Sequence, residues 1–268
     1  MVARALNQKT ARHLSWAGFL DLAQSLGCVG VEPRNDLGRP VFDGIAPAEA
    51  GRMARDRGLR LLGLSEVYPF NDWNGDRANE VRELIETAHA AGAETVSLIP
   101  RVDGQGTQDG VRQQVLRETM RAILPLLDGT DVVALVEPIG FAASSLKHKA
   151  ELVAAIDAVG GPEKFKLVHD TFQHAIAGET EIFAPHTGIV HISGISDPQV
   201  PLDETQDPHR VLVDARDRCG TIGQIAAFRA AGYAGAFSFE CTEPSLAAAP
   251  RLAGEIRRSF EYIEACMA

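Results

Sequence analysis

The sequence has little of what marks disulfide-rich or membrane proteins. Its 268 residues include only four cysteines, and these lie far apart without any C-x-x-C spacing, which argues against a disulfide framework or a zinc knuckle. No apolar run approaches the roughly 18 residues that a membrane span requires. The first residues, MVARALNQKTARHL, lack the apolar core of a signal peptide. We therefore expect a cytoplasmic protein that does not enter a membrane.

Basic residues are also scarce. The chain has 26 lysines and arginines against 36 acidic residues, and no basic run is longer than a pair. Such a chain offers no continuous positive surface to follow a phosphate backbone, so nucleic acid is not an expected partner. A few local cations can still hold a small anionic molecule in an acidic protein. The sequence leaves a homo-oligomer open.

What the chain does have is a repeated alternation of short β-type runs with helical patterns rich in Ala, Leu, Arg and Glu. Eight strands are predicted, at residues 4–8, 28–33, 60–67, 94–100, 132–138, 165–170, 188–194 and 235–241. A helix over 246–266 would complete the last unit, and no linker divides the chain. This order predicts a single (β/α)₈ TIM barrel over residues 1–268, with a long loop at 195–219. A doubly wound open sheet is the alternative, but no G-x-G-x-x-G or P-loop follows the first strand.

Polar side chains stand at the carboxyl ends of the last four predicted strands, where the active site of such a barrel lies. Because side chains alternate between the two faces of a strand, the inward-facing set of each run places one ionisable residue near the upper end of the strand. These four residues are Glu137, Asp170, His191 and Glu240. Three carboxylates and an imidazole would be costly to bury together unless a cation joined them. Oxygen-rich ligation with one nitrogen suits one divalent ion, either Mn²⁺, Mg²⁺, Co²⁺ or Zn²⁺.

Each of these residues also has an ordinary structural interpretation. Asp170 precedes Thr171 and a helical pattern, so it could simply cap the helix. His191 could be a buried core histidine, and Glu243 competes with Glu240 for the end of the last strand. His169, beside Asp170, should point away from the barrel mouth and is expected to be structural. The combination of four residues at successive strand ends favours the metal site.

The same segments carry a family resemblance. VEP at 136–138, HDTFQHAIAG at 169–178, VHISG at 190–194 and FSFE at 237–240 resemble the xylose isomerase-like barrels, particularly sugar epimerases and the inosose isomerases of inositol catabolism. The resemblance extends over nearly the whole chain. It implies that Glu137, Asp170, His191 and Glu240 bind one divalent metal and that Glu137 and Glu240 move the substrate proton. The implied substrate is a small polyhydroxy ketone, either a keto-inositol or a ketose.

One motif departs from the family pattern. Related epimerases carry D-T-F-H, whose histidine contacts a substrate oxygen, whereas this chain has Gln173 at that position and His174 one residue later. Gln173 can donate a hydrogen bond but cannot carry a proton, so the substrate or its orientation can differ. The substrate-binding candidates are Gln173, His174, Arg210, Glu32 and Arg34. Weaker candidates at the other strand ends are Asn7, Glu66 and Arg101, with Phe70, Trp73 and Phe141 as an apolar wall.

Three functions are compatible with these residues. The first is a metal-dependent isomerase or epimerase that transfers a proton between two glutamates through an enediolate. The second is a dehydratase of the inosose or dehydroshikimate type, which would expel a β-hydroxyl from the same site. The third is a sugar-binding barrel without turnover. The related apurinic endonucleases need a three-metal cluster with more histidines and a basic groove, which this acidic sequence does not indicate.

Overall fold

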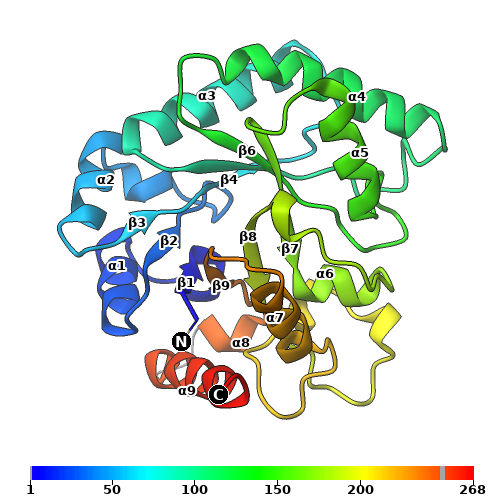
Figure 1. Ribbon diagram of the computed structural model, residues 1–268. Helices are drawn as coiled ribbons and strands as arrows, with labels where there is room; N and C mark the ends of the chain where they lie inside the picture. Colours follow the sequence, from blue (N-terminus) through cyan, green and yellow to red (C-terminus); the bar gives the residue numbers. More distant parts are fainter. Residues whose placement is uncertain (1, 248–250) are drawn as a thin grey trace.

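The computed structural model shows a parallel barrel surrounded by helices (Figure 1). It describes residues 2–247 and 251–268. Its strands are β1 (Arg4–Asn7), β2 (Gly30–Glu32), β3 (Arg60–Leu61), β4 (Leu64–Val67), β5 (Thr95–Leu98), β6 (Val133–Val136), β7 (Phe165–Asp170), β8 (Thr187–Ile192) and β9 (Phe237–Phe239). All pairings between these strands are parallel. The predicted α/β TIM barrel is confirmed.

The third predicted strand, 60–67, is split into two. β3 pairs with β2, whereas β4 pairs with β5, so the sheet runs in the order β3-β2-β1-β9-β8-β7-β6-β5-β4. At the break, the Thr95 hydroxyl donates to the carbonyl of Leu62 at 2.8 Å, and a Cβ on Gly63 would meet that hydroxyl oxygen at 2.7 Å. The lack of a side chain at Gly63 lets the two backbones approach closely. Isolated bridges between Leu61 and Ala93 and between Arg34 and Ser65 close the barrel across the break.

The helices form a ring outside the strands (Figure 1). They are α1 (Trp16–Ser25), α2 (Pro47–Arg55), α3 (Gly75–Ala91), α4 (Val111–Ile123), α5 (Lys149–Val159), α6 (Thr171–Ile176), α7 (Thr221–Ala230), α8 (Pro244–Ala247) and α9 (Leu252–Cys266). Their ends follow local sequence signals: α3 begins after Asn74, whose side chain accepts from the Arg77 amide, and ends at Gly92 in the left-handed conformation. Apart from α6, whose Phe172 packs in a separate small cluster with Ile195 and Cys219, the helices pack apolar side chains onto the outer face of the sheet. The predicted helix 246–266 includes residues 248–250, which lie outside the described residues.

A second, smaller apolar cluster fills the barrel interior. Its buried members are Ala5, Leu62, Leu135, Val168, Ile189 and Ala236. Leu135, Val168 and Ile189 each precede a site candidate by two positions, on β6, β7 and β8 respectively. Because the strand period is two, this layer lies directly below the polar side chains at the carboxyl ends. The interior layer therefore forms an apolar floor under the candidate site.

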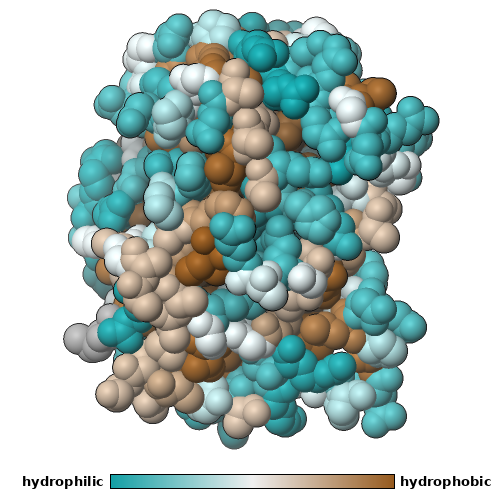
Figure 2. Space-filling model, turned by 45° about the vertical axis from the view of Figure 1, so that its right-hand side comes forward, coloured by the Kyte–Doolittle hydropathy of each residue, from teal (hydrophilic) through white to brown (hydrophobic). Residues whose placement is uncertain are grey.

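The predicted loop 195–219 contains two short 3₁₀ helices, Leu202–Glu204 and Asp207–His209. A bridge between Gly194 and Val211 fixes its position beside the end of β8. On the face shown in Figure 2, hydrophilic side chains cover much of the surface, with apolar residues in smaller groups between them. Within the described part of the chain, every helix is too short or too polar to cross a membrane.

Candidate metal centre and active site

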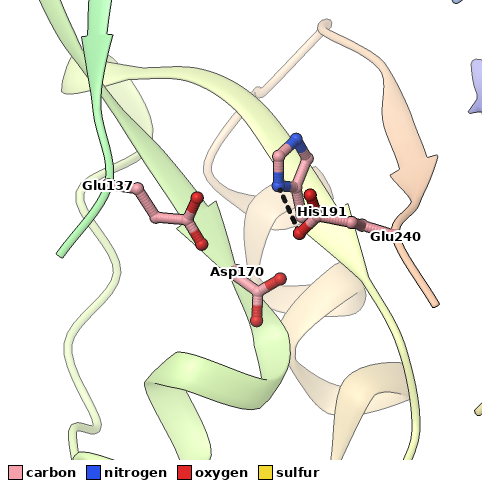
Figure 3. Close-up of side chains that lie close together, drawn as sticks. All are labelled: Glu137, Asp170, His191 and Glu240. Carbon is pink, nitrogen blue, oxygen red and sulfur yellow. Dashed lines mark ion pairs between the residues drawn. The ribbon is translucent and has the colours of Figure 1, made fainter. Parts of the chain in front are cut away.

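Four ionisable side chains converge at the carboxyl ends of neighbouring strands (Figure 3). Glu137 follows β6, Asp170 ends β7, His191 lies near the end of β8, and Glu240 follows β9. One potential ligand atom from each lies within 4.8 Å of those of all the others, and all four residues are buried. The structure thus brings together the four residues that strand alternation placed on one face.

Asp170 has both of the roles that its sequence position allows. Its Oδ1 accepts a hydrogen bond of 2.9 Å from the backbone amide of Gln173 and so caps the first turn of α6. Its Oδ2 accepts from the guanidinium of Arg210, on the side of the cluster. The cap fixes the carboxylate in one orientation, with its second oxygen on the side of the site and in contact with Arg210.

His191 is held from behind by Glu32. The imidazole Nε2 lies 2.9 Å from Oε2 of Glu32, and both side chains are about 1% exposed. Such a carboxylate fixes the tautomer and orientation of the ring. The other nitrogen, Nδ1, lies 3.3 Å from Oε2 of Glu240 but makes no hydrogen bond. A buried nitrogen without a hydrogen bond is aimed into a group of three carboxylates.

Two buried arginines balance the negative charge of the cluster. Arg210 Nη2 donates to Asp170 and, at 3.0 Å, to Oε2 of Glu240. Arg34 Nη1 donates to Oε1 of Glu240 at 2.7 Å, and its Nη2 donates to Glu66 at 2.6 Å. Each guanidinium is about 5% exposed or less. These hydrogen bonds hold Glu240 rigidly, because both of its oxygens have charged donors.

The two glutamates differ in their electrostatic surroundings. Burial raises the pKa of Glu137 well above its usual range, and the neighbouring Glu240 carboxylate raises it further. Burial acts in the same direction on Glu240, but His191 and Arg210 beside it hold the pKa of Glu240 well below its usual range. Two nearby carboxyl groups with opposite shifts are typical of sites that donate and accept protons.

A cavity of about 490 Å³ opens over the cluster and includes Glu137 and Glu240 in its wall. Residues after β5 and β6 supply an apolar side, made of Ile99, Val102, Ile139 and Phe141. Besides the two glutamates, the polar side chains in the wall are Lys9, Arg12, Arg34, Glu66, Tyr68, Gln173, Asp207, Arg210 and Thr242. Its size and mixed lining suit a small polar molecule with one apolar face.

The remaining predicted residues lie at different distances from this cavity. Gln173 lines it, and its Oε1 accepts from the Gly140 amide at 2.8 Å, which leaves its amide group as a donor. His174 does not line it; its Nδ1 lies 3.1 Å from Nζ of Lys149. Glu32 also lies outside the wall, beneath His191. Glu243 caps α8, where its Oε2 accepts from the Leu246 amide at 2.8 Å.

Among the weaker candidates, Glu66 and Phe141 line the cavity, whereas Trp73 and Arg101 line a separate surface depression. Sequence reasoning missed Lys9 and Arg12, which follow β1, and Asp207 and Thr242 on neighbouring loops. The signal for Lys9 and Arg12 is their position just beyond a strand end, similar to the signal that indicated Glu32 at the end of β2 and Arg34 two residues later.

The donor set fits a divalent metal. Three carboxylates and one imidazole nitrogen supply hard oxygen ligands with one borderline donor, as Mn²⁺, Co²⁺ and Zn²⁺ sites use. Nδ1 of His191 has no hydrogen bond, and Glu32 supports the opposite side of the ring as metal-binding histidines require. The cluster therefore has both the direct donors and the supporting hydrogen bond of a metal centre.

The barrel, its carboxyl-end cluster and its cavity define the class of protein to which the chain belongs. A family model described as the xylose isomerase-like TIM barrel matches residues 20–266. The chain belongs to this family, which confirms the resemblance seen in its strand-end motifs. No functionally curated protein sequence matches it.

Several solved structures share the fold over almost their whole length. A xylose isomerase domain-containing protein of Salmonella typhimurium LT2 is 27% identical, with a TM-score of 0.90 over 100% of this chain and 98% of that one. The IolI protein, solved with a bound zinc atom, is 14% identical, with a TM-score of 0.83 over 98% of both chains. D-psicose 3-epimerase of Clostridium cellulolyticum H10, solved with D-tagatose, is 14% identical, with a TM-score of 0.75 over 100% of this chain and 99% of that one.

Proposed function

We propose that this protein is a divalent-metal-dependent isomerase or epimerase of a small polyhydroxy ketone, a keto-inositol or a ketose. The observation that carries the proposal is the buried cluster of three carboxylates and an imidazole, of which Glu137 and Glu240 line one cavity. Family membership supports it, as do the zinc in the IolI structure and the ketose in the epimerase structure.

Glu137, Asp170, His191 and Glu240 would hold the metal. A divalent ion in such a site polarises the adjacent carbonyl and hydroxyl oxygens of a bound ketone and so acidifies the neighbouring C–H bond. Gln173 and Arg210, which line the cavity, can donate hydrogen bonds to substrate oxygens. Glu32 and His174 do not line the cavity, so they would act through the residues that they contact, His191 and Lys149 respectively.

Glu137 and Glu240 are the proposed proton-transfer pair. They come from β6 and β9, which are separated in the sheet by β7 and β8, so they approach a bound substrate from different sides. One carboxylate takes the proton from carbon, and the electron pair of the C–H bond forms an enediolate. The other carboxyl group returns a proton to the opposite face or to the neighbouring carbon. The net reaction inverts one centre or moves the carbonyl group.

Proton exchange tests this reaction. The metal-loaded protein is incubated in deuterated water with a panel of ketoses and keto-inositols, and incorporation at carbon is followed by NMR. The proposal predicts deuterium in both substrate and product, with no new ultraviolet absorption. A conjugated chromophore would instead indicate the dehydratase, because loss of a β-hydroxyl creates an enone. Saturable binding without any exchange would contradict catalysis and leave a sugar-binding barrel.

The contact between Glu32 and His191 leads to a prediction about metal affinity. Glu32→Gln keeps the size of the side chain but removes the carboxylate that orients the imidazole. We expect metal affinity to fall about 10- to 100-fold, as it does when such supporting carboxylates are lost. Titration with a competing chelator measures this change. Glu118→Gln, on the outer helix α4, should leave the affinity unchanged; equal affinity of Glu32→Gln and wild type would contradict the role of Glu32.

A further inference from the structure

The cationic side chains in the cavity wall differ in one respect. There are four of them: Lys9, Arg12, Arg34 and Arg210. Three have carboxylate partners. Lys9 pairs with Asp36 at 2.5 Å, while Arg34 and Arg210 donate to Glu240 and other acids. Among residues 2–247 and 251–268, Arg12 has no carboxylate within ion-pair distance, and its Nη1 donates only to the carbonyl of Thr242 at 3.4 Å.

Arg12 is fixed on the same rim as Glu240. It follows a 3₁₀ helix, Gln8–Ala11, that continues directly from β1. Within that helix the Thr10 hydroxyl donates to the carbonyl of Phe239 at 2.8 Å and accepts from the amide of Cys241 at 2.9 Å. The helix is therefore attached to the residues on both sides of Glu240. Arg12 stands on a rigid support beside the proposed catalytic centre.

Among the described residues, neither Glu243 nor Asp207 forms an ion pair with Arg12, although the positive charge of Arg12 contributes to the lowered pKa of Glu243. The Glu243 carboxylate accepts from Ser245 Oγ at 2.6 Å and from the Leu246 amide, so it is directed to the start of α8. Asp207, also in the cavity wall, lies 3.4 Å from Arg210. Arg12 is half-buried, and its guanidinium has unused donors that face a cavity.

We propose that the substrate carries an anionic group, a carboxylate or a phosphate, at the end remote from its carbonyl, and that Arg12 binds this group. The proposal rests on the proposed function, because it takes the keto end of the substrate to lie at the cluster of Glu137, Asp170, His191 and Glu240. Carboxylates and phosphates match the planar fork of a guanidinium, which can form two parallel hydrogen bonds with either. Lys9 uses one of its three donors on Asp36 and can supply a further contact. Because the protein has a net charge of −10, it repels anions in general. A cation without an ion-pair partner in the cavity wall would attract an anionic group to this place.

Three ketoses that differ only at carbon 6 test this inference: D-fructose, D-fructuronate and D-fructose 6-phosphate. Their dissociation constants for the metal-loaded protein are measured by titration calorimetry, with metal content determined on the same samples. We expect at least one of the two anionic compounds to bind about tenfold or more tightly than D-fructose. A preference for fructuronate would identify a carboxylate, and a preference for the phosphate compound a phosphate.

The variant Arg12→Gln distinguishes binding of the anionic group by Arg12 from direct binding of that group to the metal. The variant should lose the preference for the anionic compound and keep its metal, whereas Arg12→Lys should keep part of the preference. Arg52→Gln is the matched control, because Arg52 is exposed on α2 and pairs with Glu49 and Asp56.

Several outcomes would overturn the inference. One is that the metal-loaded protein binds neither anionic compound, or binds both no more tightly than D-fructose. Another is that the Arg12→Gln variant still prefers an anionic compound over D-fructose. Absence of metal from the wild-type protein would instead refute the proposed function on which the inference rests.

Discussion

Glu137→Gln and Glu240→Gln are each expected to lower the rate of substrate C–H exchange by about 100-fold or more, the usual contribution of a general acid or base. Glutamine keeps the shape of the side chain but cannot accept a proton at physiological pH. Both glutamates lie in the cavity wall and less than 4.8 Å from the other proposed ligands. The rate of deuterium incorporation in metal-loaded variants measures the effect.

Because both residues are also proposed ligands, metal occupancy must be determined in the same samples. A variant that keeps its ion and loses exchange supports the proton-transfer role. The two variants should differ from each other when each glutamate serves one face, since one would still exchange the substrate proton and the other the product proton. Wild-type exchange in both metal-loaded variants would exclude the two-glutamate mechanism and leave another group, such as Glu66 in the cavity wall, as the base.

Glu179→Gln is expected to destabilise the fold by about 3 kcal/mol, because it leaves a buried ammonium group without its counter-ion. The Lys149 side chain is 2% exposed, and its Nζ donates to Glu179, which also accepts from the Lys149 amide at 2.8 Å. Burial lowers the pKa of Lys149, and Glu179 acts in the opposite direction. Within the described part of the chain, the only other side chain within hydrogen-bond distance of Lys149 Nζ is His174, whose Nδ1 lies at 3.1 Å. Denaturant unfolding measures the loss.

A matched exposed pair serves as the control. Glu49 and Arg52 form an ion pair on the surface of α2, and Glu49→Gln should cost less than about 1 kcal/mol. The double change Lys149→Met with Glu179→Gln should recover much of the stability, since it removes the buried charge together with its partner. Equal losses for Glu179→Gln and Glu49→Gln would show that Lys149 does not depend on this carboxylate.

The inward-facing residues could be predicted because strand alternation is strict. Once the runs 132–138 and 165–170 are taken as strands, Leu135 and Glu137 must share a face, as must Val168 and Asp170. The structure places Leu135 and Val168 in the barrel interior and the two carboxylates above them. The period of two thus predicts both the apolar floor and the cluster, without any knowledge of how the strands pair.

Other features depend on contacts between distant residues. The break in the third predicted strand comes from the close approach of Thr95 to Gly63, and no local pattern shows this contact. Alternation places Glu32 on the inward face, but only the three-dimensional arrangement shows that it supports His191 from below. His174 is predicted as a substrate-binding residue because it follows, one residue late, the position of the histidine in the D-T-F-H motif of related epimerases. In the structure its ring packs against His169 and contacts Lys149, because it lies one residue, about 100°, further around α6 than Gln173, which lines the cavity.

Elemental analysis of the purified protein tests the central claim most directly. The cluster predicts about one divalent ion per chain, and replacement of Asp170 or His191 by alanine should remove it. Asp157→Ala and His89→Ala, at exposed positions on α5 and α3, are controls that should keep the full metal content. A negligible metal content in the wild-type protein, or an unchanged content in both the Asp170→Ala and His191→Ala variants, would contradict the assignment of this cluster as a metal centre.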